Sequence, residues 1–141
     1  MFLKKYLLIS IVVWIIDAKL SHSIEKKQKG NERPPNIIFI LADDLGYNQV
    51  GYHNSNIITP HIDELAKTGV ILEQNYMQQI CTPSRSSLMT GMYPYHIGRQ
   101  QQVIHPLTPT GLTLNKTLLP EVLRTFGYDT HLVGKWHLGH C

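Results

Sequence analysis

The apolar positions of this chain fall into short runs that are separated by polar, glycine-rich and proline-rich turns. Residues 37–42 form an unbroken apolar run that stops at two aspartates, which is typical of a strand buried on both faces. The stretches 70–77 and 128–136 are also rich in apolar residues over strand-like lengths. The pattern therefore predicts three strands.

Three other stretches have residues that are typical of helix starts and helix ends. Residues 59–69 begin with Thr-Pro, which suits a helix cap and first turn, and end at a glycine, which suits a helix stop. A short helix is predicted over residues 83–91, just after Cys81 and ending at Gly91, and a third over residues 120–127. The side chains expected to face the core are Ile62, Leu65, Ala66, Val122, Leu123 and Phe126.

The order strand, helix, strand, helix, helix, strand predicts an α/β domain with a largely parallel sheet flanked by helices. In such sheets the chemistry gathers beyond the carboxyl ends of the strands. Two aspartates follow the first predicted strand, Lys135 and His137 close the last, and Cys81 lies in a strand-to-helix junction. We therefore expect these residues at the same edge of the sheet.

The first 35 residues differ in character from the rest. Residues 1–23 are typical of an export signal, because two lysines precede an apolar run of 11 residues, 6–16, and small residues follow. The run is short for a membrane span, so no stable span is expected, and an uncleaved anchor is the alternative. Residues 24–35 form a polar linker, and residues 36–141 form the domain.

Composition narrows the classes of function. The 141 residues suffice for one small domain, and the formal net charge of +3 is local, because residues 1–33 carry +4 and residues 34–141 carry −1. No basic face with interleaved aromatic residues and no zinc-finger spacing occurs, so no nucleic-acid partner is expected. Two cysteines, Cys81 and Cys141, permit at most one disulfide, which excludes a disulfide scaffold.

Asp43 and Asp44 are adjacent carboxylates at the end of a predicted buried strand. Their mutual repulsion is unfavourable unless a cation or a proton lies between them. Hard divalent cations such as Ca²⁺ or Mg²⁺ take oxygen ligands of this kind. The alternative is an Asx-type turn that closes the strand with the help of Gly46.

The stretch Cys-Thr-Pro-Ser-Arg places Cys81 at the N-terminus of a helix, where free N–H groups and the helix dipole favour an anion. Arg85 has a planar fork that suits an oxyanion such as phosphate or sulfate. Only three residues separate Cys81 from Arg85, which argues against the Cys-x5-Arg loop of cysteine phosphatases. The alternative is a buried structural cysteine before a proline-initiated helix.

Lys135 and His137 are two residues apart, so in an extended segment they would point to the same face. A cation beside an imidazole suits an anionic centre whose leaving group needs a proton. The alternative is the end of a surface strand, with a solvated lysine and a core histidine.

These elements together resemble a known family. "LADD", "ICTPSRSSLMTG" and "GYDTHLVGKWHLG" follow one another as in the sulfatases of the alkaline-phosphatase-like superfamily, and nearly everything after residue 35 is similar to the arylsulfatase B, I and J group. The resemblance implies the N-terminal part of that superfamily's α/β domain, incomplete at the C-terminus. It also implies a hydrolase of sulfate esters.

In this family the cysteine of C-x-P-S-R is oxidised to Cα-formylglycine in the endoplasmic reticulum, by a formylglycine-generating enzyme that reads the unfolded chain. The resemblance implies that Cys81 is the modified residue. Its hydrated aldehyde would attack the sulfate ester and then expel sulfate. With the export signal, the resemblance implies the secretory pathway and then the lysosome or the extracellular space, with Asn115 of Asn-Lys-Thr as a possible glycosylation acceptor.

The resemblance also implies roles for the other candidate residues. Asp43 and Asp44 would bind Ca²⁺ together with the modified residue. Arg85 would steady the formylglycine. Lys135 would contact the sulfate and the formylglycine oxygen, and His137 would hydrogen-bond the formylglycine hydroxyl and help to move its proton.

The chain departs from the family in two ways. The second metal-binding pair of the family, an Asp-Asn, and a further His and Lys lie beyond the last matched motif, and Leu112 and Cys141 do not follow the family's cysteine pattern. We expect the 141-residue chain alone to be poorly stable and to lack turnover. The two hypotheses are the N-terminal part of a Ca²⁺-dependent formylglycine sulfatase and a truncated, catalytically dead secreted protein that only binds.

Overall fold

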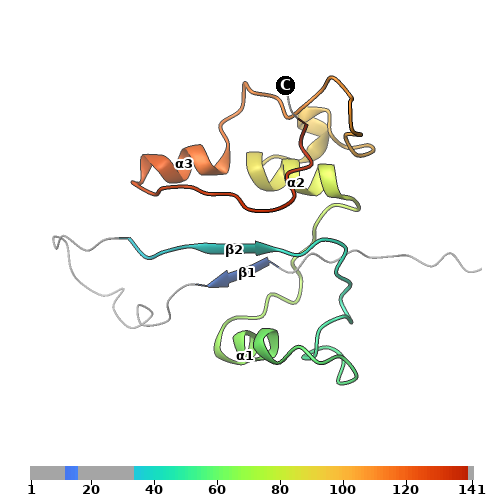
Figure 1. Ribbon diagram of the computed structural model, residues 1–141, viewed down its shortest axis with the longest axis vertical. Coiled ribbons are helices and arrows are strands. Elements are labelled where there is room, and N and C mark those ends of the chain that lie inside the picture. Colours follow the sequence, from blue (N-terminus) through green and yellow to red (C-terminus); the bar gives the residue numbers. More distant parts are fainter. Residues whose placement is uncertain (1–11, 16–33, 140–141) are drawn as a thin grey trace, which may run out of the picture. The chain divides into compact units, whose positions relative to one another are not determined.

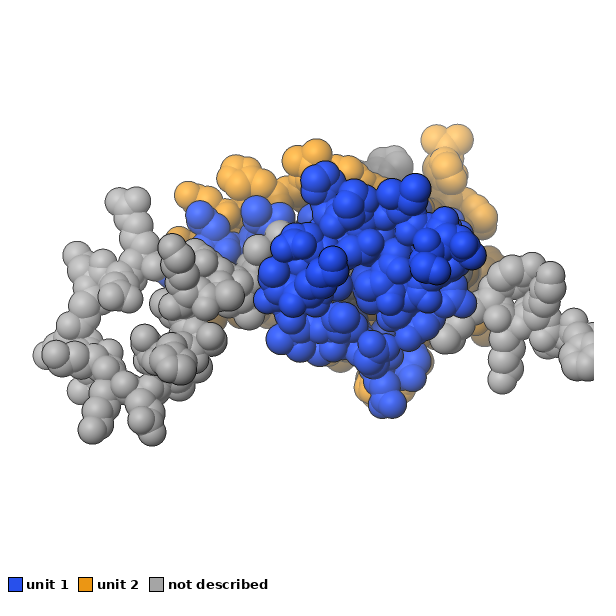
Figure 2. Space-filling model, turned by 90° about the horizontal axis from the view of Figure 1, so that it is seen from below, with its two compact units in different colours: residues 1–76 blue, residues 77–141 orange. Residues whose placement is uncertain are grey.

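The computed structural model describes residues 12–15 and 34–139 of the chain. It divides into two compact units, Met1–Tyr76 and Met77–Cys141, which Figure 2 colours separately. The first unit contains β1 (Val12–Ile15), β2 (Ile38–Leu41) and α1 (Pro60–Thr68), and the second contains α2 (Cys81–Thr90), the 3-10 helix η2 (Pro94–Ile97) and α3 (Leu119–Thr125) (Figure 1).

The two strands form an antiparallel pair, in which Val12 lies opposite Leu41 and Ile15 lies opposite Ile38 (Figure 1). The described strands therefore do not form the predicted parallel sheet. The predicted strands at 70–77 and 128–136 are wrong, because both stretches are irregular in the structure. A strand exists only through ladder hydrogen bonds to a neighbour, and within residues 34–139 neither stretch has a ladder partner.

The prediction that β2 is buried on both faces is also wrong. Ile38 and Ile40 are 57% and 51% exposed, whereas Phe39 and Leu41 are half-buried. Successive side chains of a strand point to opposite faces, so this alternation means that one face of β2 is open to solvent.

Helix α1 has the predicted bounds, and its start is held by side chains. The hydroxyl of Thr59 accepts a hydrogen bond from the amide of Gly51 over 2.7 Å and donates to the carboxylate of Asp63 over 2.9 Å. The same carboxylate accepts from the amide of Tyr52 over 3.0 Å. Thr59 is the N-cap residue, but its hydroxyl does not cap the first turn as predicted, because these two bonds occupy it. The expected inward residues of α1 are half-buried.

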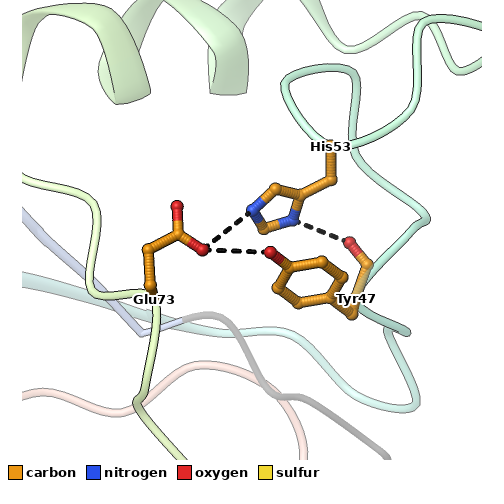
Figure 3. Close-up of polar contacts among 3 residues, drawn as sticks. All are labelled: Tyr47, His53 and Glu73. Atoms are coloured by element: carbon orange, nitrogen blue, oxygen red, sulfur yellow. Dashed lines mark hydrogen bonds and ion pairs between the residues drawn. The ribbon is translucent and has the colours of Figure 1, made fainter.

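A second polar cluster in the first unit joins Tyr47, His53 and Glu73 (Figure 3). The hydroxyl of Tyr47 donates to Glu73 over 3.0 Å, and His53 Nε2 lies 3.7 Å from the same carboxylate oxygen. The rings of Tyr47 and His53 stack with centroids 3.7 Å apart. The hydrogen bond to Glu73, above all, raises the pKa of Tyr47, and burial raises the pKa of Tyr52.

The second unit has a small apolar core of Ile97, Leu112 and Leu138, against which Met89, Met92, Leu118 and Trp136 pack. Helix α2 ends as predicted, because Gly91 takes the left-handed conformation with φ 67° and its amide donates to the carbonyl of Ser87. The inward orientation predicted for Val122 and Phe126 on α3 is wrong, since they are 42% and 69% exposed. The core residues come instead from η2 and the two loop segments that carry Leu112 and Leu138.

Among the described residues, no helix combines the length and the apolar character that crossing a membrane requires. Apart from Val12–Ile15, the predicted export signal of residues 1–23 lies outside the described residues. Residues 24–33 of the predicted linker and Cys141 also lie outside them.

Candidate active site

The N-terminus of α2 carries the first candidate residue. Cys81 is the first residue of this helix, it is half-buried, and its thiol is free. Ile80 precedes it in an extended conformation, and no side chain caps the helix. The first amides of α2 therefore have no side-chain partner at the cap, which leaves the end of the helix suited to an anion.

Most of the buried residues in the first turns of α2 are polar. Thr82, Ser84, Arg85 and Ser86 are at most 8% exposed. Burying such groups is unfavourable unless each finds a hydrogen-bond partner. Ser84 donates to the carbonyl of Gln78 over 3.0 Å, and Ser86 donates to the carbonyl of Pro83 over 3.0 Å. Thr82 and Arg85 instead donate hydrogen bonds to a segment that lies 55 and 50 residues further along the chain, respectively.

That segment is the stretch 135–137, and three contacts join it to the start of α2. The ammonium of Lys135 donates to the sulfur of Cys81 over 3.3 Å. The guanidinium Nη1 of Arg85 donates to the carbonyl of Lys135 over 2.6 Å. The hydroxyl of Thr82 donates to the carbonyl of His137 over 2.9 Å. The structure thus brings the two segments that carry Cys81, Arg85, Lys135 and His137 together, through the side chain of Lys135 and the main-chain carbonyls of Lys135 and His137.

His137 has an unusual backbone and an unusual ring. Its φ is 56°, in the left-handed region that non-glycine residues rarely adopt, and Gly134 shortly before it has φ 112°. The segment is therefore not extended at His137, as the prediction of a shared face for Lys135 and His137 had assumed. Within the part of the chain that the structure describes, the buried Nδ1 of His137 has no hydrogen-bond partner.

The residues after His137 are fixed by a short antiparallel contact. The amide of Leu112 donates to the carbonyl of Leu138 over 2.8 Å, and Gly111 and Gly139 form an isolated bridge. The guanidinium of Arg99 donates to the carbonyl of Gly111. Both ends of the stretch 135–139 are therefore anchored, one on α2 and the other on residues 111–112.

The predicted metal ligands lie in the first unit. Asp43 and Asp44 lie one residue beyond the end of β2, and both side chains are exposed. Asp44 has φ 54°, a conformation that aspartate tolerates better than most residues. Two adjacent carboxylates are hard oxygen donors of the type that Ca²⁺ takes, although that ion uses six to eight ligands.

The chain matches one family model and several known proteins. The family model named Sulfatase matches residues 35–141. The chain belongs to the sulfatase family. It is 55% identical to arylsulfatase J of Mus musculus over 105 residues, which is 74% of this chain and 18% of that protein. It is 44% identical to arylsulfatase A of Homo sapiens over 109 residues, which is 76% of this chain and 22% of that protein.

A third relative is a steryl-sulfatase. Steryl-sulfatase of Mus musculus is 41% identical over 114 residues, or 76% of this chain and 18% of that protein. The chain therefore spans about a fifth of the length of these curated relatives. The predicted resemblance to sulfatases is confirmed, and membership of this family suggests an alkaline-phosphatase-like α/β fold.

Sequence reasoning missed one residue of the site. Thr82 occupies the variable position of the C-x-P-S-R stretch, and no role was predicted for it. The available signal was a hydroxyl residue in the first turn of a helix, where such side chains commonly bond to main-chain groups. The partner, a main-chain carbonyl in another segment, has no signature in sequence.

Proposed function

We propose that this chain carries the N-terminal part of a sulfate-ester hydrolase whose reacting residue is Cys81. The observation that carries the proposal is the contact of Lys135 Nζ with Cys81 Sγ at 3.3 Å, with Arg85 and Thr82 holding the adjacent main chain. In a sulfatase this places a cation beside the atom at which an anionic ester would react.

We further propose that Cys81 is converted to Cα-formylglycine by a formylglycine-generating enzyme. The motif C-T-P-S-R is intact, and the ammonium that now donates to the sulfur would suit an oxygen at the same position equally well. The surroundings therefore fit the modified residue. When present, this group supplies a hydrated aldehyde that attacks sulfur and later releases sulfate.

The residues of the chain would then divide the work. Lys135 would balance the negative charge of the sulfate, and the free amides at the start of α2 would contribute in the same direction. His137 has a buried ring nitrogen without a partner among the described residues, so it could exchange a proton with a bound group. Arg85 would keep Lys135 in place through the main chain.

The proposal includes a Ca²⁺ ion held by Asp43 and Asp44. Both carboxylates are exposed at the end of β2, and their donor chemistry fits this ion. The ion would supply positive charge that favours the anionic form of the site. The substrate class is a sulfate ester, either an aryl sulfate or a sulfated glycan. The setting is the secretory pathway, where the exposed Asn115 could be glycosylated.

The test is mass spectrometry of the peptide that contains residue 81 after secretory expression with the modifying enzyme. We expect that peptide to lose the mass difference between a thiol and an aldehyde. Alkylation of Cys141 in the same sample is the internal control, because it shows that a remaining thiol would have been labelled. An alkylated Cys81 in every molecule would overturn the proposal. The variant Pro83→Ala, which alters the motif without removing the thiol, should stay unconverted.

A further inference from the structure

Thr82 connects three segments of the second unit through one hydroxyl. Its side chain is 1% exposed, and its Oγ1 donates to the carbonyl of His137 over 2.9 Å. The same oxygen accepts a hydrogen bond from the amide of Ile104 over 3.1 Å, and Ile104 is itself buried. A threonine hydroxyl has one proton to donate and lone pairs to accept, so both bonds form at once.

The acceptor of this bond is the carbonyl of the residue whose backbone is strained. His137 adopts φ 56°, which an L-residue with a side chain holds only when its surroundings enforce it. The bond from Thr82 is one such constraint. It fixes the plane of the peptide unit after His137, and thereby the direction in which the Cα–Cβ bond of this residue points.

Arg85 does not duplicate this role. Its guanidinium donates to the carbonyl of Lys135, two residues earlier, over 2.6 Å. The first turn of α2 therefore holds the stretch 135–137 at two separate carbonyls. Arg85 controls the position of Lys135, and Thr82 controls that of His137.

We propose that Thr82 is a positioning residue that orients the imidazole of His137 toward the group at residue 81. The inference rests on the proposed function of the site, and it assigns a role to the variable position of the C-x-P-S-R stretch. The hydroxyl is the part of the side chain that matters, because both observed bonds use it.

The chain offers a matched set of variants. Thr82→Val keeps the shape and removes the hydroxyl, whereas Thr82→Ser keeps the hydroxyl and removes the methyl group. Thr90→Val is the control, because Thr90 in the same helix also donates to a carbonyl, that of Ser86 over 2.7 Å, and also accepts from an amide, that of Met92 over 3.3 Å. A general loss of helix stability should affect Thr82→Val and Thr90→Val alike.

Two nuclear magnetic resonance measurements on the 141-residue chain test the inference without turnover. In Thr82→Val, amide exchange at Ile104 should be about 10-fold faster, because its acceptor is lost. The Cα and Cβ shifts of His137, which report its left-handed backbone, should move toward ordinary values. Thr82→Ser and Thr90→Val should match the unsubstituted protein in both. Unchanged His137 shifts and Ile104 exchange in Thr82→Val would overturn the inference.

If Thr82→Val does not fold, the other variants still decide. The inference requires that the Ile104 amide is protected in the unsubstituted protein and in Thr82→Ser, and an unprotected amide in either would overturn it. Conversion of Cys81, measured in each variant, tests the proposed function separately. In a form that turns over an aryl sulfate, Thr82→Val should lower kcat about 10- to 100-fold with little change in KM. An unchanged kcat there would also overturn the inference.

Discussion

The guanidinium of Arg85 is buried, and one of its nitrogens donates to the main-chain carbonyl of Lys135. Arg85→Lys keeps the charge but loses the planar fork, and the shorter reach leaves the carbonyl without its donor. We expect a loss of about 1.5–3 kcal/mol in the free energy of unfolding, the usual net contribution of a hydrogen bond that involves a charged group.

This prediction is checked by urea denaturation followed by tryptophan fluorescence. Arg124→Lys on the surface of α3 is the matched control, because the side chain of Arg124 is exposed. Equal midpoints for the two variants would mean that the contact between Arg85 and Lys135 contributes nothing measurable to stability.

Asp43 and Asp44 allow a test in which charge alone changes. Asparagine has the shape of aspartate and tolerates left-handed backbone, so Asp44→Asn should keep the local conformation with φ 54°. Because the proposed ion is held by carboxylate charge, Asp43→Asn and Asp44→Asn should each weaken Ca²⁺ binding about 10-fold or more, as measured by calorimetry. Asp129→Asn, an exposed residue of the second unit, should leave the affinity unchanged. If Asp43→Asn and Asp44→Asn also leave it unchanged, the pair is a structural turn.

At the scale of elements, alanine substitutions at two glycines with positive φ can distinguish the effect of backbone strain from the effect of steric overlap. Gly91 ends α2 with φ 67°, and a Cβ built there meets no atom within 4 Å. Gly139 has φ 81°, but a Cβ there would overlap the carbonyl oxygen of Thr110 and lie 2.5 Å from the Cα of Gly111. The added methyl group would push apart the bridge that anchors the stretch after His137.

Gly91→Ala should therefore lose about 1 kcal/mol of stability, from strain alone. Gly139→Ala should lose clearly more, since strain and overlap act together. Thermal unfolding of both variants side by side measures the difference. Similar melting temperatures would show that the bridge between Gly111 and Gly139 yields without cost.

The three α-helices of the described residues could be predicted from sequence, whereas two of the three predicted strands are irregular in the structure. The Thr-Pro pair at the start of α1 and Gly91 after α2 affect only the helical turn in which they lie. Local start and stop residues were therefore enough to predict these two helix ends. The stretches 70–77 and 128–136 have strand-like composition, but a strand also needs a distant partner. Within the described residues neither stretch has such a partner, and the composition of a stretch does not show whether a partner strand is present.

The same distinction applies to the candidate site. The residues Cys81, Arg85, Lys135 and His137 could be named as candidates because they lie in motifs that resemble those of the sulfatases, and their catalytic roles stay predictions. How they are held together could not, because Arg85 and Thr82 bind main-chain carbonyls, and every residue has one. The left-handed backbone of His137 could not be predicted either, because glycine is the residue that commonly indicates positive φ in a sequence.

At the scale of the whole molecule, little apolar surface is buried. The buried hydrophobic side chains among the described residues are Val50, Ile97, Ile104, Leu112 and Leu138. Meanwhile Ile58, Leu107 and Val133 are 89%, 93% and 100% exposed. So small a buried core provides little free energy to offset the conformational entropy that the chain loses on folding.

We therefore expect the 141-residue chain, on its own, to bind the hydrophobic dye ANS and to have only marginal stability, so that it unfolds at low urea concentration. Dye fluorescence in buffer is compared with fluorescence in concentrated urea, where the chain is unfolded and bound dye is released. A chain that does not bind the dye and has the stability of an ordinary small domain would show that its small cores suffice for an independent fold.

The contacts that bury the start of α2 come from residues 50 and 55 positions later in the chain. During synthesis at about 5–20 residues per second, the stretch 81–85 is made about 2.5 to 10 s before Lys135 and His137 exist to cover it. An enzyme that acted on the unfolded motif, as proposed for Cys81, would therefore have this interval in which to work. Under that proposal, the sequence separation between the two segments would keep Cys81 accessible while the rest of the domain is synthesised.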